Sequence, residues 1–225
     1  MEKKGRLIVI DGSDGSGKAT QAKMLVQRLK KDGVPVRTMD FPQYEKNFFG
    51  AFIGKCITGD HGDFLTLDPR ITSVLYAADR FESSAKITQW LADGCTVIMD
   101  RYVSANQIHQ GGKIFDPRKR REFLVWLDAM EYGVFHLPRP DMVIYLDVPI
   151  TTSVGLLRRA QQKKQYLKEG KNDLVEQSMD YLHNARKSAL WLARTQKGWH
   201  RVQCIKEDQL RTVEDIHEEV LALIS

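Results

Sequence analysis

Five short apolar runs, rich in β-branched residues, recur along the chain and predict the strands of one sheet. They cover residues 7–10, 34–39, 96–99, 142–146 and 202–205. Longer segments with apolar residues at helical spacing separate them, which is typical of βαβ units and a parallel sheet. The first, third and fourth runs are apolar almost throughout, as in central strands covered on both faces. The pattern predicts an α/β fold with a five-stranded parallel sheet flanked by helices.

Turn and capping residues predict where helices begin and end. A helical pattern covers residues 19–31, and Gly33 follows it where a C-cap is expected, as Gly94 does before the third apolar run. Asp68-Pro69 predicts a helix start with proline in the first turn. Residues 212–224 predict an amphipathic helix packed on the sheet.

Length and composition predict a single soluble domain covering residues 1–225. The chain is 42% apolar and 28% charged, values that are ordinary for globular proteins. No run approaches the ~20 apolar residues of a membrane span, and no secretory hydrophobic stretch follows Met1, so we expect no membrane partner. The three cysteines are few, odd in number and far apart, which favours reduced thiols in the cytoplasm.

Positive charge is concentrated in one segment of the second half of the chain. The formal charge is +5, and residues 158–171 hold six Lys and Arg against one Glu, an excess equal to that of the whole chain. This cluster has three interpretations: a nucleic-acid footprint, a solvated helix face, or a basic lid over a polyphosphate. The surrounding stretch 150–191 predicts two helical segments with a break near Gly170, a candidate hinge.

The most informative motif follows the first apolar run. Residues 12–18 read Gly-Ser-Asp-Gly-Ser-Gly-Lys and precede a predicted helix, the context that defines a phosphate-binding loop (P-loop). Its glycines let backbone N–H groups point at phosphate oxygens, while the helix N-terminus and Lys18 add positive charge. The other interpretation is a glycine-rich turn without a ligand. Ala19 stands where a hydroxyl residue usually follows the lysine, and Thr20 comes one position later.

Polar residues follow the other predicted strands and are expected to meet the P-loop, because ligands bind beyond the carboxyl ends of parallel strands. Asp100-Arg101 follows the third run. The planar guanidinium of Arg101 could hold an acceptor phosphate, although a surface ion pair is the alternative. Asp100, with Asp14 nearby in the loop, could orient Mg²⁺ or its waters.

A second candidate site lies on the predicted helix after Asp68. Tyr76 and Arg80 are four residues apart and share a helix face, so together they could stack on and hydrogen-bond a nucleobase. Spacing alone favours a core tyrosine and a solvated arginine instead.

Together the motifs identify a family. From Arg6 to about Ala193 the chain resembles the thymidylate kinases, in the P-loop and in five further segments. These are Phe41-Pro42, the stretch 75–80, Asp100-Arg101-Tyr102 with Asn106-Gln107, the stretch 137–148, and Asp173 and Glu176 followed by Arg186. The resemblance implies a P-loop three-layer sandwich with a helical lid at about residues 155–175.

The resemblance also implies roles for individual residues. The ATP phosphates would lie against Gly12, Ser13, Asp14, Gly15, Ser16, Gly17, Lys18, Ala19 and Thr20. The acceptor would be bound by Phe41, Tyr76, Arg80, Arg101, Asn106, Gln107 and His109, with Tyr76 stacked on thymine and Arg80 bonded to a base carbonyl. Catalytic roles would fall to Lys18, Asp14, Arg101, Arg158, Arg159 and Glu176, and the metal to Asp14 and Asp100. Because the P-loop lacks an arginine, the lid arginines would supply the catalytic charge.

The resulting hypothesis is an ATP- and Mg²⁺-dependent kinase that phosphorylates dTMP to dTDP. The resemblance also implies a homodimer, and assigning the basic segment to a lid leaves no need for a nucleic-acid partner. Two alternatives remain. One is a kinase for another deoxynucleoside monophosphate such as dUMP. The other is a nucleotide-binding homologue impaired in catalysis, which the missing hydroxyl at Ala19 suggests. A nucleic-acid-dependent ATPase would also contain a P-loop.

Overall fold

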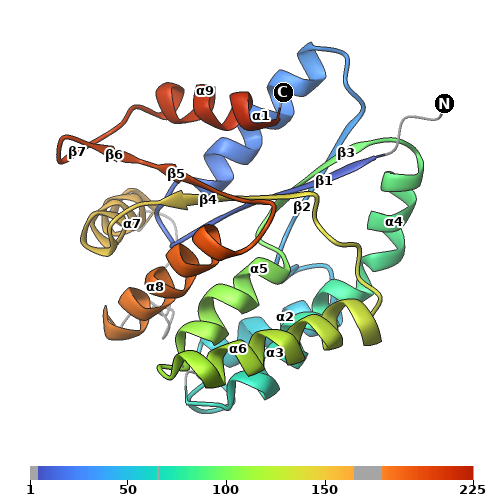
Figure 1. Ribbon diagram of the computed structural model, residues 1–225, viewed down its shortest axis with the longest axis vertical. Coiled ribbons are helices and arrows are strands. Elements are labelled where there is room, and N and C mark those ends of the chain that lie inside the picture. The colour runs from blue at the N-terminus through green and yellow to red at the C-terminus, as the bar shows by residue number, and fades with distance from the viewer. Residues whose placement is uncertain (1–4, 65, 165–178, 225) are drawn as a thin grey trace.

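The computed structural model describes residues 5–64, 66–164 and 179–224 and contains the predicted parallel sheet (Figure 1). Its five strands lie in the order β2-β3-β1-β4-β5 and all neighbouring pairs are parallel. Their bounds are β1 (Arg6–Gly12), β2 (Val36–Asp40), β3 (Thr96–Asp100), β4 (Met142–Asp147) and β5 (Trp199–Gln203). The predicted sheet is confirmed.

The fifth strand differs from its prediction by three residues at its start. The apolar run at 202–205 marks only its end, because Trp199 and His200 already pair with Val143 and Ile144 of β4. Ile205 belongs to a short antiparallel pair formed by β6 (Ile205–Lys206) and β7 (Gln209–Leu210).

Helices cover both faces of the sheet, which gives three layers (Figure 1). The helices α1 (Lys18–Lys31) and α9 (Val213–Ile224) lie on one face. The other face is covered by α3 (Pro69–Glu82), α4 (Ser84–Ala92), α6 (Pro117–Asp128) and α8 (Met179–Thr195). The remaining elements are α2 (Phe48–Ile57), α5 (Val103–Ala105), α7 (Ile150–Lys164) and two π-helical turns, η1 (Asn106–Gln110) and η2 (Ala129–Val134).

The continuous apolar runs reflect burial on both sides. In β1, Ile8 and Ile10 pack with α1 and α9, while Leu7 and Val9 pack into the core on the opposite face. All four side chains are fully buried. Removing such side chains from water is the main favourable contribution to folding, at roughly 1.5–3 kcal/mol each.

The predicted helix boundaries are largely confirmed. The Asp68 carboxylate caps α3 by accepting a hydrogen bond from the Arg70 N–H at 2.7 Å, and Pro69 is the first helical residue. Gly33 and Gly94 follow α1 and α4 with φ of 72° and 74°, the left-handed conformation that glycine adopts most readily. The break predicted near Gly170 lies outside the described residues.

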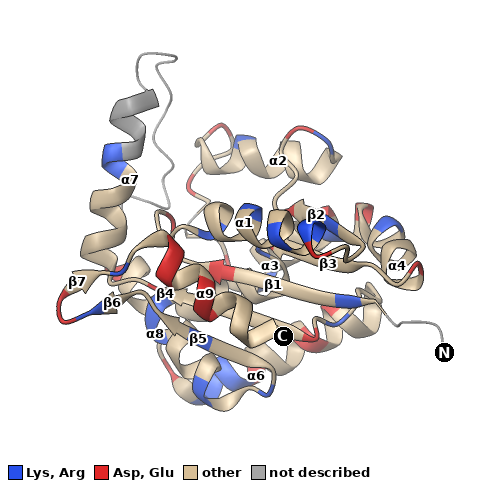
Figure 2. Cartoon of the chain, turned by 90° about the horizontal axis from the view of Figure 1, so that it is seen from above, with Lys and Arg blue, Asp and Glu red and all other residues tan. Residues whose placement is uncertain are grey.

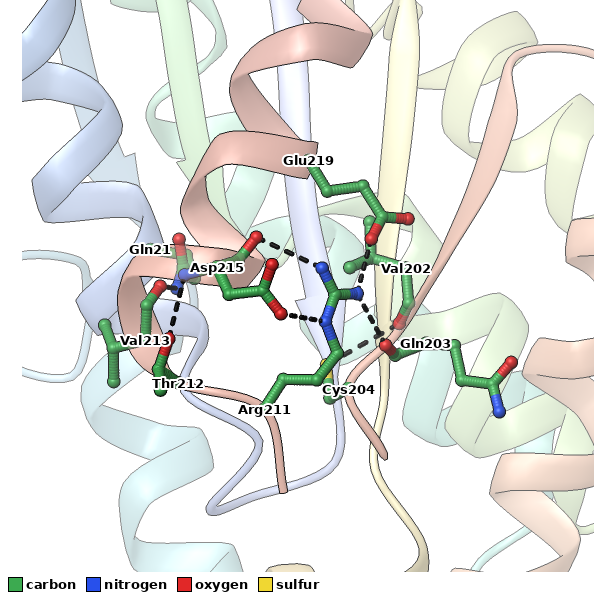
Figure 3. A network of polar contacts seen from close by, with 9 residues as sticks. All are labelled: Gln21, Val202, Gln203, Cys204, Arg211, Thr212, Val213, Asp215 and Glu219. Atoms are coloured by element: carbon green, nitrogen blue, oxygen red, sulfur yellow. Dashed lines mark hydrogen bonds and ion pairs between the residues drawn. The ribbon is translucent and has the colours of Figure 1, made fainter. Parts of the chain in front are cut away.

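Arg211 fastens the end of β5 to α9 (Figure 3). Its guanidinium donates to the Gln203 carbonyl at 2.8 Å and to the Asp215 carboxylate at 2.6 Å, and it also pairs with Glu219. The Gln21 side-chain amide donates to the Val213 carbonyl at 2.8 Å, which links α1 to the same helix. The helix that carries the P-loop is therefore held against the sheet through α9.

Within the described ranges, every helix is too short or too polar to span a membrane.

Candidate active site

The P-loop connects the end of β1 to the first residue of α1 and curls back on itself. Gly15 and Gly17 have φ of 80° and 90°, and a Cβ on Gly15 would lie 2.3 Å from the Ser153 carbonyl oxygen, so this position requires glycine. The Lys18 ammonium donates to the Ser13 carbonyl at 2.9 Å. The loop therefore closes around its own lysine at the N-terminus of a helix, an arrangement that binds anions.

Two hydroxyls of the loop lack partners. Ser13 Oγ and Ser16 Oγ are buried and make no hydrogen bond within the part of the chain that the structure describes. Leaving a buried polar group unpaired costs about 1–3 kcal/mol, so these oxygens are available for a ligand.

Arg101 joins the P-loop to the end of β3. It forms an ion pair with Asp14, and its Nη1 lies 3.3 Å from Nε2 of His109. Its backbone has a φ of 66°, which is uncommon for a residue other than glycine and is typical of functional sites. The Arg101 N–H donates to the Ile10 carbonyl at 3.0 Å, which holds this turn against β1.

Burial and charge determine the protonation states around Arg101. Burial alone would raise the pKa of Asp14, but the charges of Arg101 and Lys18 outweigh it and hold that pKa below its usual range. Burial lowers the pKa of His109 to about 3, and the charge of Arg101 acts in the same direction. Burial and Arg101 likewise lower the pKa of Lys18, whereas burial raises the pKa of Asp100. A carboxylate and a neutral imidazole therefore flank Arg101 at neutral pH.

A cavity of about 510 Å³ extends from the P-loop to α3 and η1. Thirteen of the predicted site residues line it. They come from the P-loop and the start of α1, from the ends of β2 and β3, and from α3 and η1. They are Asp14, Gly15, Gly17, Lys18, Ala19, Thr20, Phe41, Tyr76, Arg80, Asp100, Arg101, Asn106 and His109. Gly12, Ser13 and Ser16 of the P-loop motif are not among the described residues that line the cavity. The volume is within the range of small-molecule sites.

Tyr76 and Arg80 both face this cavity. Tyr76 is half-buried, and its ring lies 6.0 Å from that of Phe64, edge to face. Arg80 is only 1% exposed, because its guanidinium pairs with Glu131 of η2, with Nε donating to Oε2 at 3.0 Å. The alternative of a solvated arginine is therefore wrong.

The predicted role of Gln107 is not supported by its position. Gln107 is absent from the described residues that line the cavity, and Gln110 stands there instead. Residues four apart on a helix share a face and successive residues do not, so Gln110, rather than Gln107, lies beside Asn106. The Gln107 backbone carbonyl accepts a hydrogen bond from Ser188 of α8 at 3.1 Å.

Two of the predicted lid residues do not line the cavity, and the third is not among the residues that the structure describes. Arg158 and Arg159 are exposed on α7, which projects from the rest of the molecule (Figure 2). Neither is among the described lining residues. Glu176 lies outside the described residues.

Sequence reasoning did not single out several polar residues at or beneath the cavity. Gln110, Lys113 and Tyr181 line it, and the Tyr181 ring stacks on His109 with centroids 6.1 Å apart. Glu131 lies beneath it and is fully buried. The available signal was a glutamate directly after the apolar pair Ala129-Met130, because a buried carboxylate needs a charged partner.

Comparisons with known proteins agree on one family. The family model described as thymidylate kinase matches residues 10–220. The thymidylate kinase of Schizosaccharomyces pombe is 29% identical, with 100% of this chain and 93% of the relative covered. A probable thymidylate kinase of Pyrococcus horikoshii is 30% identical, with 98% and 96% covered. The structure of thymidylate kinase from Candida albicans has the same fold, with a TM-score of 0.72 and 21% identity over 98% of this chain and 91% of that one.

Proposed function

The chain belongs to the thymidylate kinase family, the phosphotransferases that convert dTMP to dTDP with ATP, and we propose that it binds the two nucleotides on either side of Arg101. The position of Arg101 carries this proposal. It contacts Asp14 of the P-loop on one side and His109 of the cavity wall on the other. Phosphoryl transfer depends chiefly on placing two phosphates in line and neutralising their charge, and a guanidinium at this boundary serves both ends.

The P-loop forms the donor subsite. Loop amides and the Lys18 ammonium bind the ATP phosphates, and the unpaired Ser13 and Ser16 hydroxyls complete the polar surface. Thr20 lines the cavity one position after Ala19 and supplies a hydroxyl there.

The part of the cavity lined by α3 and η1 forms the acceptor subsite. Arg101 holds the dTMP phosphate, with two N–H groups directed to two oxygens. Tyr76 stacks on the base, and Phe41 packs near the deoxyribose. Arg80 and Asn106 hydrogen-bond the base edge, since both polar groups face the cavity from its floor.

The site also suits Mg²⁺, which in proteins usually keeps several waters and takes one or two carboxylates plus substrate phosphates. Asp14 and Asp100 line the cavity beside the P-loop, and burial raises the pKa of Asp100, although the charges of Lys18 and Arg101 act against it. The described residues contain no group of three or more acidic, His or Cys side chains that could hold a metal ion. When bound, the ion would neutralise phosphate charge.

Arg158 and Arg159 supply positive charge from α7. Both are exposed in the segment that the sequence predicts as a lid, and no P-loop arginine is available for this role. The assignment makes α7 part of the catalytic machinery within one domain of residues 1–225.

A second copy of the chain covers the apolar face of α3 and α6. Ile71, Val74 and Phe81 of α3 are 57%, 40% and 51% exposed, and Val125 of α6 is 71% exposed. The two helices are neighbours, with Arg70 stacked on Trp126 at 5.6 Å. Apolar side chains gathered on adjacent helices mark an interaction surface.

The three cysteines, all described, are buried free thiols, which suits a reducing cytoplasm.

Calorimetric titration of two variants tests the division into subsites. Lys18→Ala should weaken ATP binding and nearly abolish turnover while dTMP still binds. Arg101→Ala should weaken dTMP binding with a smaller effect on ATP. Equal effects of both variants on both nucleotides would refute two separate subsites, and circular dichroism checks that each variant is folded.

A further inference from the structure

Glu131 lies beneath the acceptor cavity and holds Arg80 in a buried ion pair. Glu131 is 0% exposed and Arg80 is 1% exposed. Nε of Arg80 donates to Oε2 of Glu131 at 3.0 Å, and Nη2 contacts Oε1. Two contacts between planar groups fix the guanidinium plane as well as its position. Nη1 also donates to the Tyr102 carbonyl at 3.4 Å, which leaves one hydrogen on Nη1 and one on Nη2, and the pair with Glu131 directs these two hydrogens.

The same carboxylate determines how the Asn106 amide is oriented. Nδ2 of Asn106 donates to Oε1 of Glu131 at 2.8 Å and to the Ser73 carbonyl at 3.1 Å. Both partners only accept hydrogen bonds, so the amide must turn its nitrogen toward them. Both hydrogens on Nδ2 are thereby used. Oδ1, which no other described residue contacts by a hydrogen bond, is the group that Asn106 offers to the cavity it lines.

The floor of the cavity therefore presents an acceptor beside a donor. The acceptor is Asn106 Oδ1 and the donor is the outer edge of Arg80. A thymine or uracil ring matches this pair, because its N3–H donates and its O4 accepts. Cytosine presents the opposite hydrogen-bonding pattern to thymine and uracil, because its N3 accepts and its N4 amine donates.

We propose that Glu131 is a positioning residue that makes the enzyme select keto pyrimidines over cytosine, by fixing the Asn106 amide and the Arg80 guanidinium. This inference depends on the proposed placement of the dTMP base against Arg80 and Asn106. Sites built to hydrogen-bond a substrate group reject an analogue that lacks it by factors of ~10⁴–10⁵. Such rejection requires that the protein groups cannot reorient, and Glu131 prevents them from doing so. Uracil presents the same edge as thymine, so Glu131 does not separate dTMP from dUMP.

The test compares dTMP with dCMP in a Glu131→Gln variant. A glutamine has one accepting oxygen, so it cannot satisfy Arg80 Nε, Arg80 Nη2 and Asn106 Nδ2 together. We expect the ratio of kcat/KM for dTMP to that for dCMP to fall about 10-fold or more, mainly through a higher KM for dTMP, with KM for ATP unchanged. A parallel loss with both substrates, leaving the ratio as in the wild type, would overturn the proposal.

Asp147→Asn is the matched control. Asp147 is also a buried carboxylate, 2% exposed, and it pairs with Arg186 and Arg201 outside the cavity lining. Its loss should leave the dTMP to dCMP ratio unchanged whatever it does to stability. A wild-type enzyme that did not turn over dTMP would instead refute the proposed function.

If Glu131→Gln is insoluble, Glu131→Asp takes its place in the comparison. It keeps the negative charge but withdraws the carboxylate by one methylene, so the pair with Arg80 and Asn106 loosens. The same selectivity loss supports the proposal, and an unchanged ratio with a lower melting temperature contradicts it.

Discussion

Arg101 at the end of β3 and Asp14 in the P-loop form an ion pair that joins the two halves of the active site. Burial tends to lower the pKa of Arg101, but Asp14 and its neighbours Asp11 and Asp100 raise it overall, so the guanidinium is charged throughout the working pH range. The pair holds the planar guanidinium of Arg101, a hydrogen-bond donor, between the P-loop and the part of the cavity proposed to bind dTMP.

Arg101→Lys should lower kcat/KM for dTMP by about 10² although the charge is kept. A lysine is a point donor and cannot form the two parallel hydrogen bonds of a guanidinium with phosphate. Steady-state kinetics with varied dTMP provide the measurement. Arg37→Lys, an exposed arginine on β2, is the control and should leave the kinetics unchanged. Wild-type kinetics for Arg101→Lys would argue against a bidentate phosphate contact.

Loss of both Arg158 and Arg159 to alanine should lower kcat by about 10³, because an arginine that stabilises the transferring phosphoryl group contributes 10³–10⁵ in related reactions. Single-turnover kinetics would separate this effect from product release. Alanine at both Arg118 and Lys119, exposed cations on α6, is the matched control for lost charge. An unchanged kcat would remove the catalytic role from α7.

The buried neutral state of His109 should make stability depend on pH. Burial lowers its pKa in the folded protein to about 3, against 6.5 for an unperturbed histidine. The unfolded chain therefore binds a proton first as pH falls, and stability is lost progressively below pH 6.5 until about pH 3. Arg101, Asp14, Lys18 and Lys113 are the charged groups that act on it.

Urea unfolding at pH 7 and pH 5 measures this dependence. His109→Gln should lose less stability between the two pH values than the wild type. Equal losses would mean that His109 is protonated when folded.

Arg211→Ala should destabilise the fold by about 2–3 kcal/mol, because it removes a largely buried guanidinium that joins β5 to α9. The Arg28→Ala control breaks an exposed pair with Asp32 and should cost about 0–1 kcal/mol. Denaturant unfolding reports both values. Similar costs for the two variants would show that the network in Figure 3 adds little to stability.

Glutamate at both Ile71 and Val125 should convert a dimer to a monomer, because charges would be buried at the proposed interface. Light scattering after size-exclusion chromatography measures the mass. The control is Val213→Glu. Val213 is exposed on α9, which covers the opposite face of the sheet, so this variant should leave the mass unchanged. A wild-type mass equal to that of one chain would contradict the dimer.

Local sequence patterns were sufficient for the sheet and the P-loop. The strands are marked by continuous apolar runs such as Leu7–Ile10, and the loop by glycines that its backbone requires. Both patterns extend over only a few consecutive residues, so they can be recognised without knowledge of tertiary contacts.

Side-chain partners distant in the chain could not be predicted in this way. Arg80 and Glu131 are 51 positions apart, and only the folded core brings them together. The position of Gln110 rather than Gln107 in the cavity lining has a similar cause, because the face of η1 that meets the cavity depends on how this turn packs against α3 and α8. The family resemblance implies that Arg80 binds the base, and Arg80 does line the cavity, but the resemblance does not identify Glu131, the carboxylate that pairs with it.

The most direct test of the two-nucleotide site is a steady-state comparison of dTMP, dUMP, dCMP, dAMP and dGMP as acceptors with ATP as donor. The account predicts dTMP as the best acceptor, dUMP accepted, and dCMP and both purine monophosphates strongly disfavoured. A preference for a purine monophosphate, or ATP binding without turnover of any acceptor, would contradict it.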